Sequence, residues 1–219
     1  NIFSDEGKPI KYWGKTGINE GELNGPSGIA FDSEDNIFVS DHLNNRIQKF
    51  TKDGDFISSF GDEGQDTLNM PWGLFVSADE FIYVADWGND RIAKYDTNGK
   101  LIRCFGNRGS KNCQFKNPSG VAVDNDGYIY ITDWGNERLQ ILDKNGNFIE
   151  TYRGEGTLSK WGEEYMDGNH EEAEPRSRSD LEPDPTQFGG DPHEESAHIE
   201  KYFWGPTSVK LDDRGRVYI

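Results

Sequence analysis

The sequence has few basic residues and no long apolar run. Its 219 residues include 23 Lys or Arg against 40 Asp or Glu, a formal net charge of -17. Such an excess repels phosphate backbones, so we expect no nucleic-acid partner. No apolar stretch approaches the roughly 20 residues that a membrane helix needs, so we expect no membrane insertion.

Cysteine and methionine are also scarce, with two of each. Cys104 and Cys113 lie nine residues apart around an expected loop, a spacing that allows either a disulfide bridge or two free thiols. Glycine is plentiful, with 26 residues, and 13% of the chain is aromatic. Glycine favours turns and aromatic side chains favour pleated strands, so the composition indicates a globular protein rich in strands and turns.

Much of the acidity belongs to one segment. Between Glu155 and Lys201 there are 14 acidic and 4 basic residues, and four prolines interrupt the same stretch. We expect an acidic insertion over 155–203 whose charged, Pro-rich middle buries little surface and is mobile, with short helices at its two aromatic flanks. The sequence leaves open whether it is a solvated surface excursion or a lid.

The rest of the chain repeats itself about every 46 residues. "GPSGIAFDSEDNIFVSDHLNNRIQKF" at 25–50 aligns with "MPWGLFVSADEFIYVADWGNDRIAKY" at 70–95 and "NPSGVAVDNDGYIYITDWGNERLQIL" at 117–142. Each unit contains four short β-type runs separated by turn clusters; in the first they are Gly28–Phe31, Ile37–Ser40, Arg46–Phe50 and Phe56–Phe60. One four-stranded antiparallel unit every ~40–50 residues is typical of a β-propeller blade.

The sequence pattern of the units resembles the NHL-repeat family of six-bladed, TolB-like propellers. P-x-G-[IVL] is followed by [IY]-V-x-D-x-x-N-x-R-[IL] and a hairpin ending in aromatic-Gly. The resemblance implies an all-β fold with three complete and two partial blades, and a monomeric ring. The expected division is 1–14 as the end of a blade, blades at 24–61, 69–106 and 116–154, the insertion, and 204–219 as the start of a blade. A fragment of a longer propeller and a closed four-blade ring are both compatible with these ends.

An Asp and an Arg recur at fixed spacing in every unit. With four residues between them, they flank a hairpin loop and face each other across the strand pair. We expect these pairs to brace the hairpin; they are Asp41 with Arg46, Asp86 with Arg91, and Asp133 with Arg138. The Asn at 44, 89 and 136 suits a turn residue at positive φ.

Trp residues gather at one expected rim. Strands of a blade alternate in direction, so the loop after the second strand shares a face with the blade-to-blade connections. These connections have 11, 9, 11 and 51 residues between the glycines at 14, 61, 106 and 154 and the Pro at 26, 71, 118 and 206 that begins the next unit. We expect a ligand to bind the side chains there, namely His42, Trp72, Trp87, Trp134 and Trp204. Packing between adjacent blades is the alternative role of the Trp.

Propellers resembling metal-dependent lactonases offer another function, a hydrolase or lyase. Those enzymes hold a divalent cation such as Ca²⁺ with carboxylates near the start of the innermost strands, where this chain has Ser27, Trp72, Ser119 and Thr207. We therefore expect no catalytic residue, metal site or cofactor in this sequence.

RNA binding, known for some NHL domains, relies on a basic rim. Here the rim carries Asp62, Glu63, Asp66 and the acidic insertion against Arg108, Lys111 and Lys116. The sequence thus predicts a non-catalytic NHL propeller scaffold that binds a protein segment, a glycan or a small molecule on its Trp-bearing rim.

Overall fold

The computed structural model describes residues 2–64, 67–154, 165, 167–171, 174 and 203–219. The predicted acidic insertion lies almost entirely outside the described residues. The hypothesis that it forms a lid concerns those same residues. Within the described residues, no helix is long and apolar enough to cross a membrane.

Three four-stranded antiparallel sheets dominate the structure, and in each the strands pair in chain order. The first sheet holds β5 (Pro26–Phe31), β6 (Ile37–Asp41), β7 (Arg46–Phe50) and β8 (Phe56–Phe60). The second holds β9 (Pro71–Val76), β10 (Ile82–Asp86), β11 (Arg91–Tyr95) and β12 (Leu101–Phe105). The third holds β15 (Pro118–Val123), β16 (Ile129–Asp133), β17 (Arg138–Leu142) and β18 (Phe148–Tyr152). The expected all-β class is confirmed, and the strands of the first unit differ from the prediction by two residues or fewer.

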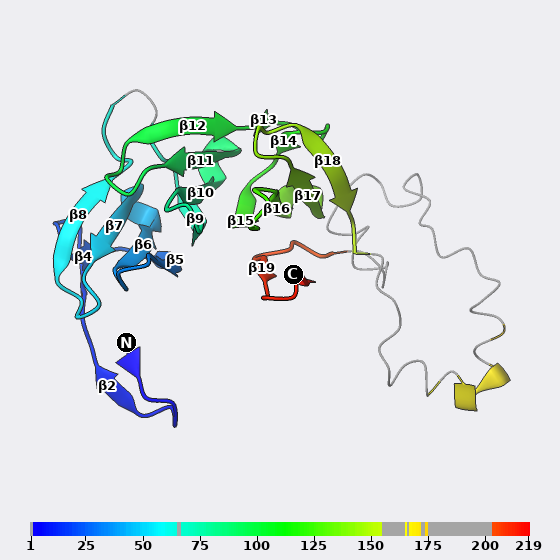
Figure 1. Ribbon diagram of the computed structural model, residues 1–219, viewed down its shortest axis with the longest axis horizontal. Helices are drawn as coiled ribbons and strands as arrows, with labels where there is room; N and C mark the ends of the chain where they lie inside the picture. The colour runs from blue at the N-terminus through cyan, green and yellow to red at the C-terminus, as the bar shows by residue number, and fades with distance from the viewer. Residues whose placement is uncertain (1, 65–66, 155–164, 166, 172–173, 175–202) are drawn as a thin grey trace.

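The sheets stand side by side in an arc, as the blades of a propeller do (Figure 1). The first strand of each sheet lies on the inner side of the arc and the fourth on the outside. The innermost strands are neighbours, with β9 between β5 and β15, and β15 next to β19 (Lys210–Leu211). This arrangement gives each blade one face toward the preceding blade and one toward the next.

Short strands make up the partial units and the connections. β1 (Ile2–Phe3) pairs with β2 (Pro9–Lys11), and β19 pairs with β20 (Val217–Tyr218). Two connections each contain a short parallel pair, formed by β3 (Lys15–Thr16) with β4 (Glu22–Leu23) and by β13 (Asn107–Arg108) with β14 (Gln114–Phe115).

The hydrophobic core lies between blades. One cluster joins Phe38 and Ile47 of the first blade to Leu74 and Val84 of the second, and a second cluster joins the second and third blades in the same way. Because each cluster draws on two sheets, the same burial that stabilises a blade also fixes it to its neighbour.

Neither cysteine forms a disulfide. Cys104 packs against the cluster between the first and second blades, whereas Cys113 packs against the cluster between the second and third. The two cysteine side chains thus pack against different hydrophobic clusters.

Candidate functional site on the rim of blade connections

The rim is organised around a fully buried Asp at the end of each second strand. Asp41, Asp86 and Asp133 have no exposed surface, and each lies directly opposite an Arg in the strand register. The Arg Nε donates to the Asp Oδ2 at 2.8 Å in the first blade, 2.7 Å in the second and 2.9 Å in the third.

Further donors use the remaining lone pairs of these carboxylates. The Oδ1 atom accepts the main-chain N–H of the preceding connection, from Asn24, Asn69 and Lys116, at 2.6 to 2.8 Å. Burial raises the pKa of Asp133, and the hydrogen bonds from the Lys116 amide, Asn136 and Arg138 oppose that rise. Each Asp thereby fastens its hairpin to the incoming connection.

The hairpin loops are single turns of 3₁₀ helix, and this corrects one expectation. They are η1 (His42–Asn44), η2 (Trp87–Asn89) and η3 (Trp134–Asn136). The Asn that ends each turn does not adopt positive φ; its Nδ2 donates to the buried Asp at 2.8 or 2.9 Å. The next residue takes the left-handed conformation, at φ 56° for Asn45, 54° for Asp90 and 52° for Glu137.

Two of these left-handed residues reach the next blade. Asn45 Oδ1 accepts the amide of Met70, and Asp90 Oδ1 accepts the amide of Asn117, both at 2.8 Å. Met70 and Asn117 are themselves at positive φ, directly before the Pro that begins an innermost strand. Sequence reasoning missed this link between blades, although its signal is a side-chain oxygen directly after the repeated Asn.

Four of the five predicted ligand-binding residues form one continuous row of rings. His42 meets Trp72 edge-on with centroids 4.9 Å apart, Trp72 meets Trp87 at 5.3 Å, and Trp87 meets Trp134 at 5.0 Å. The row therefore crosses all three blades, and contacts between blades hold it together.

Exposure differs along the row. His42 is 7% exposed, and its Nδ1 lies 3.2 Å from the Pro71 carbonyl oxygen. The three Trp of the row are half-buried. Trp204 is 69% exposed and precedes Gly205, whose backbone packs against the indole of Trp134.

The starts of the innermost strands surround a hollow of about 430 Å³. The Ser27 hydroxyl donates to the Pro71 and Trp72 carbonyls, and the Ser119 hydroxyl donates to the Pro206 carbonyl at 2.6 Å. These hydroxyls tie the innermost strand of the first blade to that of the second, and the innermost strand of the third blade to the start of the next unit. Among the described residues, no group of three or more His, Cys, Asp or Glu is placed to hold a metal ion.

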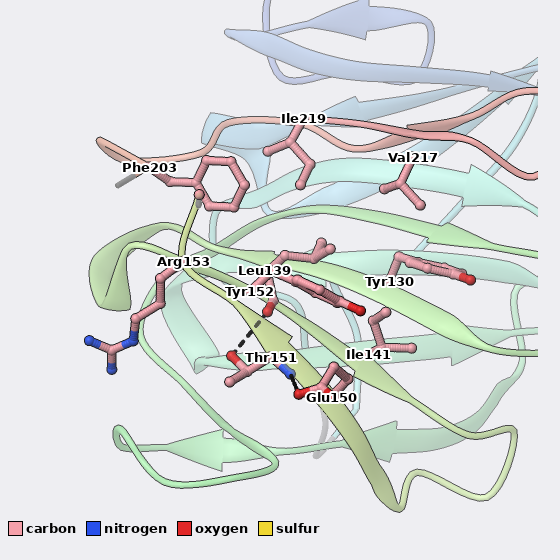
Figure 2. A pocket seen from close by; sticks show the side chains of 11 residues that line it. Tyr130, Leu139, Ile141, Glu150, Thr151, Tyr152, Arg153, Phe203, Val217 and Ile219 are labelled. Atoms are coloured by element: carbon pink, nitrogen blue, oxygen red, sulfur yellow. Dashed lines mark hydrogen bonds between the residues drawn. The ribbon is translucent and has the colours of Figure 1, made fainter. Parts of the chain in front are cut away.

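A larger hollow, of about 990 Å³, lies between the third blade and β20 (Figure 2). Leu139 and Tyr152 line it, at the repeat positions that Ile47 and Phe60 occupy in the first blade. Ile47 and Phe60 belong to the core between blades, whereas Tyr152 is 52% exposed. The lining consists of blade-packing positions and contains none of the predicted ligand-binding residues.

The four-stranded blades lie radially, and at each hairpin a buried Asp binds an Asn and an Arg. These features define a repeat propeller. Residues 23–50 and 115–142 match the model of the NHL repeat. The chain therefore carries NHL repeats in these two segments, and the predicted resemblance to the NHL repeat is confirmed.

Curated relatives match over one segment each. The chain is 50% identical over 50 residues to Protein lin-41 of Caenorhabditis elegans, which is 23% of this chain and 4% of that protein. It is 42% identical over 53 residues to Protein brain tumor of Drosophila melanogaster, covering 24% and 5%. It is 40% identical over 58 residues to RING finger protein nhl-1 of C. elegans, covering 26% and 6%. The chain thus spans a small fraction of the length of these relatives.

Solved structures with a similar backbone include a streptogramin B lyase, with a TM-score of 0.44 and 21% identity over 58% of this chain and 39% of that one. Hydrazine synthase of Kuenenia stuttgartiensis has a TM-score of 0.48 and 16% identity over 61% and 37%.

Proposed function

We propose that the NHL-repeat blades form a non-catalytic scaffold that binds a ligand on the Trp-bearing rim. The observation that carries this proposal is the continuous row of His42, Trp72, Trp87 and Trp134, to which each of the three complete blades contributes. The hairpins need the Asp, Asn and Arg, because these close the turns, whereas the first blade closes the same turn without Trp.

Each residue has a part in this proposal. Trp72, Trp87 and Trp134 are half-buried and would present the parts of their rings that the row leaves open. Trp204 would supply an exposed aromatic contact beside them, and the buried His42 would support the edge of Trp72. We also propose that the scaffold acts as a monomeric ring, and that its partner is not a nucleic acid, because the net charge of -17 opposes phosphate.

Substitution of the rim Trp tests the proposal. Trp134→Ala and Trp204→Ala should abolish binding to whichever member of a panel of arrayed peptides and glycans binds the unchanged protein. Trp13→Ala is the matched control, because Trp13 is a half-buried Trp that packs on Phe50, with centroids 4.8 Å apart, and on Gly54 in a turn of the opposite face. Undiminished binding by both rim variants would refute the proposal.

A further inference from the structure

The chemistry of the rim narrows the class of ligand, and we propose that the Trp-bearing rim docks an extended polypeptide segment with apolar side chains, basic at one end and acidic at the other. This inference rests on the proposed function, since it concerns the same surface. Four features support it: the packing of the rings in the row, the hydrogen bonds that already occupy the polar groups of the hairpin turns, the exposed apolar side chains at the ends of the row, and the charges of the adjacent connections.

The rings of the row cover one another. Trp87 has Trp72 against it at an interplanar angle of 34° and Trp134 at 44°, with both centroids within 5.3 Å. A sugar or a nucleobase binds Trp by lying flat on a ring face. Because neighbouring indoles occupy two sides of Trp87, a flat ligand would have to part the row, whereas apolar side chains would pack along its exposed edges.

The polar groups of the hairpin turns themselves are already in use. Each buried Asp accepts an amide, an Asn and an Arg, as described above. The amides of Leu43, Gly88 and Gly135 donate to main-chain carbonyls of the connections at 2.8 to 3.0 Å. Recognition of a glycan requires several free, oriented polar groups, so this saturation favours a ligand that is held mainly through apolar area.

Exposed apolar side chains extend the row at both ends. Leu43 is 54% exposed at η1, Met70 is 37% exposed before β9, and Trp204 is 69% exposed before Pro206. With the three half-buried Trp they place six large apolar side chains on one rim, from the first blade to the start of the fourth unit. Apolar surface of this extent, rich in Trp and Met, is typical of protein-binding sites.

Charge changes sign along the row. The connection beside Trp87 carries Asp62 and Glu63 without any Lys or Arg in 62–70, and its Asn69 carbonyl accepts the Gly88 amide. The connection beside Trp134 carries Arg108, Lys111 and Lys116 without any Asp or Glu in 107–117. Arg108 already lies 3.8 Å from Asp90, so the basic groups that a segment meets near Trp134 are Lys111 and Lys116. A segment lying along the row therefore meets acidic groups near Trp87 and these two lysines near Trp134, which fixes its polarity through charge complementarity.

A phage-displayed library of random dodecapeptides tests this inference on the full chain. We expect enrichment of peptides with two or more apolar residues, Lys or Arg toward one end and Asp or Glu toward the other. Trp204→Ser should weaken the selected peptides about tenfold or more, as expected for loss of an interface anchor. Lys116→Glu should weaken peptides with an acidic end and spare those in which that end is neutral.

The matched control is Ile102→Ser, which removes a 48% exposed apolar side chain from β12, on the outside of the arc. A glycan array and a random RNA pool are screened in parallel. Binding of a glycan or an RNA that depends on Trp204, without selected peptides, overturns the polypeptide inference and leaves the proposed rim site standing. Failure of every probe to respond to Trp204→Ser and Trp134→Ala overturns both.

Discussion

Arg138 balances the negative charge of the Asp133 carboxylate, which has no access to water. Arg138 is 3% exposed and Asp133 is completely buried, so Arg138→Ala would leave a buried charge without its partner. We expect the free energy of unfolding to fall by about 3–5 kcal/mol. Urea denaturation measures this loss, and Arg216→Ala is the control. Arg216 pairs with Asp212 but is 61% exposed in its side chain, so its removal should cost at most about 1 kcal/mol.

The pH dependence of the Arg138→Ala variant provides an independent check. Burial raises the pKa of Asp133 above 3.8, so the folded state binds more protons than the unfolded state and the free energy of unfolding decreases as pH rises through that window. Loss of Arg138 removes a lowering influence and enlarges the effect. The variant should therefore be less destabilised at about pH 5 than at about pH 7, and equal destabilisation at both would contradict this account.

Burial and the neighbouring Asp124 together raise the pKa of Tyr130. Burial raises the pKa of Tyr130 to about 12, and its hydroxyl donates to Asp124 Oδ2 at 3.0 Å, which favours the neutral phenol. Burial and the bond to Asp212 also raise the pKa of Tyr218, so ultraviolet difference absorbance should show a late-titrating step with contributions from both tyrosines. The Tyr130 contribution should be lost in Tyr130→Phe and should titrate earlier in Asp124→Asn. Between about pH 10 and 12 the folded state keeps this proton and the unfolded state loses it, so stability decreases with pH there. An undiminished amplitude of the late step in Tyr130→Phe would refute the assignment.

Among the elements, the parallel strand pairs of two connections depend on a buried Gln in the third strand. Gln140 accepts the Cys113 amide at 3.1 Å and donates to the Gln114 carbonyl at 2.8 Å, and Gln48 makes the matching bonds to Gly21 and Glu22. The second blade has the buried Ala93 at this position, and its connection is two residues shorter. The longer connections thus occur with a Gln in the third strand that hydrogen-bonds them, and the shorter connection occurs with an Ala there.

Gln140→Ala should loosen the 107–117 connection selectively. The Cys113 amide and the Gln114 carbonyl would lose their partners, at a cost of about 1–3 kcal/mol. Hydrogen exchange should accelerate at Cys113 and remain unchanged at Gly21, where Gln48 provides an internal control. Uniform acceleration over all blades would instead indicate global destabilisation, and unchanged exchange at Cys113 would contradict the role of Gln140.

The strands could be predicted from the sequence because the period of the repeat, the turn residues and the alternation of apolar positions agree in each unit. The conformation of the hairpin loop was harder to predict from the sequence, because one turn of 3₁₀ helix places the positive φ at Asn45 instead of Asn44. Contacts among His42, Trp72, Trp87 and Trp134 were not predictable in detail, because they depend on the angle between blades. No local pattern encodes that angle.

At the scale of the whole molecule, glycine governs how closely successive blades approach. Gly28, Gly73 and Gly120 occupy the same position of the innermost strand in three units. A Cβ would lie 2.5 Å from the Trp72 carbonyl oxygen at Gly28 and 2.6 Å from the Ser119 carbonyl oxygen at Gly73. At Gly120 it would lie 2.7 Å from Thr132 Oγ1 of the same blade and 2.9 Å from the Ser208 Cα. At each position a backbone atom of the next unit stands within 3 Å, so glycine is required here for proximity rather than for backbone conformation.

Gly73→Ala should therefore push the second and third blades apart. Because backbone cannot move aside as a side chain does, the strain should cost about 1–3 kcal/mol, the range typical of overpacking. The same displacement would stretch the contact between Trp87 and Trp134, whose centroids are 5.0 Å apart, and so weaken the near-ultraviolet circular dichroism of the indoles. Gly168→Ala is the control, since nothing lies within 4 Å of a Cβ there. If Gly73→Ala lowered the melting temperature without changing the indole signal, the row of rings would not depend on the approach of the blades; if neither changed, the close packing of the innermost strands would not limit that approach.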